Sequence, residues 1–107
     1  MKYEKLVRDK IPEIIEQNGQ RCKTRILSDE EYLRAVDAKL DEELAEYHRD
    51  QNIDELADLI EVAYAAAAAR GYSAEELERV REAKVKKRGR FEKKILLIKT
   101  MDTDTKE

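Results

Sequence analysis

The sequence has few of the residues that build sheets, tight loops or disulfides. Its 107 residues include one Pro, three Gly, one Cys and no Trp, and aromatic residues make up 6%. Sandwiches and barrels need many turn residues and aromatic or β-branched strands, so this composition predicts a mainly α fold. Cys22 has no second cysteine to pair with, which suits a reducing, cytoplasmic location.

Long apolar runs are also missing. No segment approaches the roughly 20 apolar residues of a membrane-spanning helix, and the charged N-terminus lacks the apolar centre of a signal peptide. We therefore expect no membrane role. The length suits a single domain, which we place at residues 1–99, followed by a polar C-terminal tail at residues 100–107.

Charged residues make up 44% of the chain, and the two signs are separated along it. Residues 28–61 contain thirteen Asp or Glu and three Lys or Arg, whereas residues 79–99 contain ten Lys or Arg and two Glu. The commonest explanation of such a basic run is a solvated helix face, and substrate phosphate binding by Lys84 or Arg88 is the main alternative. Nucleic-acid binding ranks last because the acidic centre opposes it.

Helix-start signals occur at four places. A Ser or Asn followed three residues later by Glu is typical of a helix N-terminus, and Pro is well suited to the first turn. These signals are Asp9 with Pro12, Ser28 with Glu31, Asn52 with Glu55, and Ser73 with Glu76. The sequence therefore predicts four helices, of which the third is apolar around most of its circumference and central.

Two further features concern the sheet content and the assembly. The segments Arg21–Leu27 and Phe91–Ile98 alternate weakly or carry an apolar run, which predicts that any sheet is a small two-stranded ribbon between them. The small side chains of Ala65–Ala69 would let helices approach closely, so we expect a helical bundle assembled as a homodimer or a higher homo-oligomer.

Two acidic pairs lie at mirror-image distances on either side of a predicted turn at residues 50–52. If the flanking helices are antiparallel, Glu46 faces Glu55 and Glu43 faces Asp58. Glu42 points further away from the apolar stripe of its helix. Acidic pairs on charged helices are usually solvated, but two facing pairs beside packed surface require cations or a metal ion. The pattern predicts a Mg²⁺ site, which Mn²⁺ would also suit.

The strings Glu42-Glu43-Leu-Ala-Glu46 and Glu55-Leu-Ala-Asp58 resemble the EExxE…ExxD signature of the MazG-like, all-α nucleotide pyrophosphohydrolase superfamily. The segments 3–12, 25–32 and 88–92 resemble its phosphoribosyl-ATP pyrophosphohydrolase-like branch. The resemblance covers about Tyr3 to Ile98. The stretch between the two motifs is short for the superfamily and fits a tight helical hairpin.

This resemblance implies an enzyme that cleaves a nucleoside triphosphate between the α- and β-phosphates, giving a monophosphate and pyrophosphate, and that removes non-standard nucleotides. Its metal ligands would be Glu43, Glu46, Glu55 and Asp58, and the base would be Glu46 or Glu42. The candidate phosphate-binding cations are Arg8, Lys10, Lys39, Lys84 and Arg88. The alternatives are a non-catalytic helical interaction module that keeps the fold, or the phosphoribosyl-ATP pyrophosphohydrolase of histidine biosynthesis.

Overall fold

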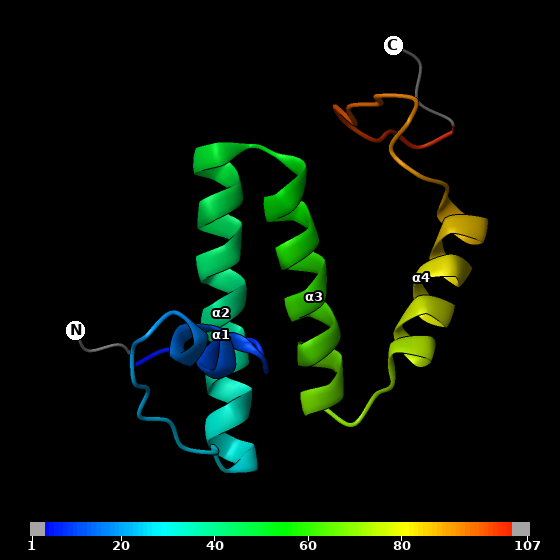
Figure 1. The fold of residues 1–107 in the computed structure, drawn as a ribbon. Coiled ribbons are helices and arrows are strands. Elements are labelled where there is room, and N and C mark those ends of the chain that lie inside the picture. Colours follow the sequence, from blue (N-terminus) through cyan, green and yellow to red (C-terminus); the bar gives the residue numbers. More distant parts are fainter. Residues whose placement is uncertain (1–3, 104–107) are drawn as a thin grey trace.

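The computed structural model describes residues 4–103, which are helical or coil throughout (Figure 1). The predicted mainly α fold is confirmed. The helices are α1 (Ile11–Gln17), α2 (Asp29–Asp50), α3 (Ile53–Ala69) and α4 (Ala74–Arg88). None of these helices is long and apolar enough to cross a membrane. Tyr3 and the last four residues of the predicted polar tail lie outside the described residues.

Side-chain caps begin α2, α3 and α4 as predicted. Ser28 and Ser73 each form a complete capping box with the Glu three residues later, and Asn52 accepts a hydrogen bond from the backbone N–H of Glu55 at 3.0 Å. The predicted Asp9 cap of α1 is wrong, because Lys10 is the N-cap residue and no side chain caps this helix. Pro12 lies in the first turn of α1 and brings no N–H group that would need a cap.

A two-residue connection joins α2 to α3. The helix α2 ends at Asp50, Gln51 adopts a left-handed backbone conformation with φ of 50°, and Asn52 opens α3. The chain therefore reverses direction at once, and α3 runs antiparallel along α2 (Figure 1). At the other end of this hairpin, Arg70 forms an ion pair with Asp37 at 3.4 Å.

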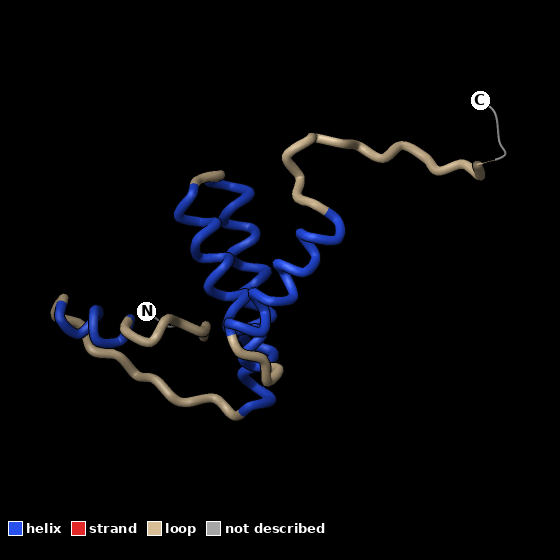
Figure 2. Tube along the Cα trace, turned by 90° about the vertical axis from the view of Figure 1, so that its right-hand side faces the viewer, coloured by secondary structure: helices blue, strands red, loops and turns tan. Residues whose placement is uncertain are grey.

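The hairpin is only partly covered by the rest of the chain. Val36 is the fully buried hydrophobic residue of the described part, and α4 approaches α3 but not α2. Tyr64 of α3 donates a hydrogen bond to Glu78 of α4 at 2.8 Å. α1 stands away from the hairpin in Figure 2. The radius of gyration is 19.6 Å, against about 13 Å for a compact domain of this length, so a single copy is an open arrangement.

The predicted two-stranded ribbon does not form. Residues 21–27 and 91–98 are both coil, and they lie on opposite sides of the molecule in Figures 1 and 2. Ile26 is 95% exposed and Ile95 is 80% exposed. A strand exists only when a partner pairs with its backbone, and the fold of one copy brings these two segments no partner.

Candidate metal centre

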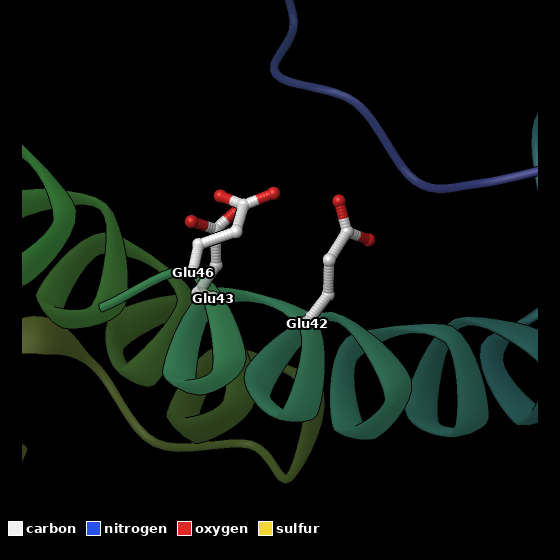
Figure 3. Close-up of side chains that lie close together, drawn as sticks. All are labelled: Glu42, Glu43 and Glu46. Carbon is white, nitrogen blue, oxygen red and sulfur yellow. The ribbon is translucent and has the colours of Figure 1, made fainter. Parts of the chain in front are cut away.

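Two sets of three carboxylates share Glu43. In the α2 triad, Glu42, Glu43 and Glu46 all come from one helix, and Figure 3 shows them on the same side of it. In the interhelical triad, Glu43 joins Glu55 and Asp58 of α3. Within each triad, one oxygen atom from each residue lies within 4.8 Å of the other two. The structure thus gathers the four predicted metal ligands at one place along the hairpin.

Glu42 belongs to this cluster, although it is more exposed than Glu43, as its predicted direction away from the apolar stripe implies. Its side chain is one-third exposed, and its Oε1 atom lies 3.3 Å from the ammonium group of Lys39. The helical position sets only the direction of the Cα–Cβ bond, and the remaining torsions of a glutamate let its carboxylate swing toward a cation one turn away. Lys39 lies on the cluster side of α2 and draws Glu42 toward it.

Two buried carboxylate oxygens in the cluster have no hydrogen-bond partner. They are Oε2 of Glu43, whose residue is only 6% exposed, and Oε2 of Glu55. Burying an ionised oxygen without a partner is costly, so such atoms normally face a donor or a cation. Both residues belong to the interhelical triad, where a hard divalent cation would satisfy their carboxylates. The residues present therefore fit Mg²⁺ or Mn²⁺ at this triad.

Three cationic side chains contact the cluster. Lys39 Nζ lies 3.3 Å from Oε1 of both Glu42 and Glu43. Arg8 Nη2 donates to Asp58 Oδ1 at 2.7 Å, and Lys5 Nζ lies 3.6 Å from Glu42 Oε1. The N-terminal segment that carries Lys5 and Arg8 runs past Glu42 in Figure 3. Arg8 and Lys39 were predicted as cations of the site, whereas Lys5 was missed because a contact so distant along the chain leaves no local sequence signal.

The other three predicted phosphate-binding cations lie elsewhere. Lys10 is the exposed N-cap residue of α1 and forms no ion pair within residues 4–103. Lys84 and Arg88 are exposed in the second half of α4, a helix that does not contact α2. Within one copy of the chain, these side chains do not contribute to the carboxylate cluster.

The carboxylates of Glu43 and Glu55 are harder to ionise than an ordinary glutamate. Burial is the main cause of the raised pKa of Glu43, which the Lys39 ammonium opposes and the charge of Glu46 reinforces. Burial also raises the pKa of Glu55, and the charges of Glu46, Asp50, Asp58 and Glu43 add to the effect. Both shifts reflect burial first and the neighbouring negative charges second.

These shifts predict how the stability of the metal-free protein depends on pH. Above the ordinary pKa of 4.5, the folded protein holds protons on Glu43 and Glu55 that the unfolded chain has released. The free energy of unfolding should therefore fall as pH rises from 4.5 through the raised pKa values. Below 4.5 it should fall again as the pH approaches the pKa of Glu31, which its hydrogen bonds with Arg25 lower to about 2.

Urea denaturation in the presence of a chelator, repeated across this pH range, measures the dependence. The variant Glu55→Gln should lose less stability as the pH rises above 4.5, because it lacks one of the two carboxyl groups whose pKa is raised. A metal-free protein that becomes steadily more stable from pH 4.5 to neutrality would contradict the carboxylate geometry described above.

A comparison with known proteins finds a relative that matches part of the chain. No family model matches the chain, and no solved structure matches it. An uncharacterized protein of Mycolicibacterium smegmatis (strain ATCC 700084 / mc(2)155) is 61% identical over 41 residues, which are 38% of this chain and 42% of that protein. The similarity thus spans less than half of either protein and carries no description of an activity.

Proposed function

We propose that this protein is a Mg²⁺-dependent nucleotide pyrophosphohydrolase of the MazG-like superfamily. The observation that carries the proposal is a pair of buried carboxylate oxygens without hydrogen-bond partners, one on Glu43 and one on Glu55. These two residues lie on facing helices and belong to the same triad. A solvated helix face would leave its carboxylate oxygens in contact with water. The motif resemblance then supplies the reaction class, cleavage between the α- and β-phosphates with release of pyrophosphate.

Glu43, Glu55 and Asp58 would hold the metal ion, and Glu46 extends the ligand set from α2. When bound, Mg²⁺ would neutralise charge on the nucleotide phosphates and lower the pKa of a bound water molecule. We assign proton acceptance to the Glu46 carboxylate rather than to Glu42. Glu42 Oε1 is engaged by both Lys5 and Lys39, whereas Glu46 forms no ion pair in the described part of the chain.

The nucleotide phosphates would also need positive side chains. Arg8 is the best placed, because its guanidinium group lies at the rim of the interhelical triad and is 57% exposed. Its contact with Asp58 uses one carboxylate oxygen, and a guanidinium group has further N–H donors that can reach a phosphate. Arg8 would therefore orient the phosphate chain while it holds Asp58 in place.

We also propose that the protein functions as a homodimer. Ile53 and Ile60 of α3 are 76% and 56% exposed, and Val80 of α4 is 55% exposed. Apolar side chains on neighbouring helices that stay exposed in one copy are typical of a surface that a second copy covers. Sedimentation or light scattering at micromolar concentration tests this part of the proposal.

A pyrophosphate-release screen tests the activity. Ordinary and modified nucleoside triphosphates and phosphoribosyl-ATP should each be incubated with the protein, with Mg²⁺, with Mn²⁺ and with a chelator. Metal-dependent release of pyrophosphate together with the monophosphate would support the proposal, and a preference for phosphoribosyl-ATP would favour the histidine-pathway alternative. Absence of release from every nucleotide would favour a non-catalytic interaction module.

A further inference from the structure

The two triads offer ligands for two cations, but a cationic side chain of the protein already contacts the α2 triad. Lys39 Nζ lies 3.3 Å from Oε1 of Glu42 and 3.3 Å from Oε1 of Glu43. Its side chain is only 16% exposed. An ammonium group with so little access to water stays next to its carboxylates, because hydration would not compensate for the lost ion pairs. The Lys39 ammonium thus lies beside two of the three carboxylates of the α2 triad.

The interhelical triad is different. Glu43 is 6% exposed, and its second oxygen, Oε2, is buried without a partner, as is Oε2 of Glu55. The third member, Asp58, pairs with Arg8 through one oxygen only. Glu43 therefore has one oxygen beside Lys39 and a second that is buried without a hydrogen-bond partner.

We propose that Lys39 acts as a built-in cation that fills the α2 triad and limits this protein to one divalent ion, bound at the interhelical triad. The proposal rests on the metal site of the proposed function and adds its stoichiometry. A second divalent ion bound by Glu42, Glu43 and Glu46 would lie beside the ammonium group. The repulsion between these charges should weaken its binding roughly ten-fold or more. Lys39 is thus a positioning residue for Glu43 and not a ligand of the substrate phosphates.

The variant Lys39→Met tests this inference, because methionine keeps most of the apolar stem and removes the charge. Mn²⁺ binding without nucleotide should be counted by calorimetry and by elemental analysis after gel filtration. We expect one ion per chain in the wild type and two in Lys39→Met. Ions that share a carboxylate lie about 4 Å apart, so the variant should also show the broadened electron paramagnetic resonance spectrum of a coupled Mn²⁺ pair.

Three further variants locate the ions. Lys39→Arg keeps the charge and should bind one ion, as should Lys86→Met, which removes the same charge from an exposed site on α4. In the Lys39→Met background, Glu42→Gln should remove the second ion and leave the first, because Glu42 belongs to the α2 triad alone. Circular dichroism of each variant prepared in Mn²⁺ reports whether it folds.

Two ions in the wild type would overturn the inference, whatever the variants do. One ion in a folded Lys39→Met protein would also overturn it, and weaker nucleotide binding in that variant would then make Lys39 a phosphate ligand. These outcomes are separate from the fate of the proposed function. If the counts are one and two but no nucleotide releases pyrophosphate, the proposed activity fails and the role of Lys39 stands.

Discussion

Replacing Glu43 with glutamine should lower metal-dependent pyrophosphate release at least ~100-fold. Glu43 is the residue that both triads share, and it is the most buried carboxylate of the cluster. Glutamine keeps the size of the side chain but replaces one ligand oxygen with an N–H₂ group that repels a cation. The loss should therefore come from metal binding, with the fold retained. Initial rates at rising Mg²⁺ concentration measure the effect.

The matched control is Glu61→Gln, an exposed position on the same hairpin that belongs to neither triad, and its rates should stay within about two-fold of the wild type. Glu42→Gln should lower the rate less than Glu43→Gln does, because Glu42 belongs to one triad only and one of its oxygens pairs with Lys39. Equal losses from Glu42→Gln and Glu43→Gln, or a fully active Glu43→Gln protein, would show that the catalytic metal ion is not held between α2 and α3.

The parts of the structure that the sequence predicted well are those determined by near neighbours. A capping box needs only residues three positions apart, so the beginnings of α2 and α4 follow from Ser28 with Glu31 and from Ser73 with Glu76. The placing of Glu43 opposite Asp58 needs one further condition, a short turn. Gln51 supplies it with its left-handed conformation, and the mirror spacing of the acidic pairs then brings their carboxylates together.

The errors of the sequence analysis arise where the structure depends on contacts between distant segments or on the conformation of flexible side chains. Pairing of residues 21–27 with 91–98 requires an approach that the helices between them do not produce. The contact of Lys5 with Glu42 joins segments far apart in the chain and leaves no local pattern. The sequence does predict that Lys39 lies near Glu42 and Glu43, since it precedes them by three and four residues on one helix. The sequence alone does not show that its ammonium group is held between these two carboxylates and not directed toward a substrate.

Magnesium should raise the melting temperature of the protein in the absence of any nucleotide. The interhelical triad exists only in the folded chain, so an ion that binds there stabilises the folded state by mass action. At a free Mg²⁺ concentration ~100 times Kd, one site contributes about 2.7 kcal/mol to the free energy of unfolding, which corresponds to a shift of roughly 10 °C or more for a domain of this size. Differential scanning calorimetry with Mg²⁺, with Mn²⁺ and with a chelator measures the shift.

The variants Glu55→Gln and Asp58→Asn separate this effect from general screening of charge. Each removes a ligand of the interhelical triad, so each should lose most of the Mg²⁺-induced shift. Glu55→Gln should also melt at a higher temperature than the wild type when metal is absent, because it removes a buried charge that four neighbouring carboxylates repel. Glu61→Gln should keep the full shift. A wild-type protein whose melting ignores millimolar Mg²⁺ and Mn²⁺ would mean that the helices do not form a metal site in advance of the nucleotide.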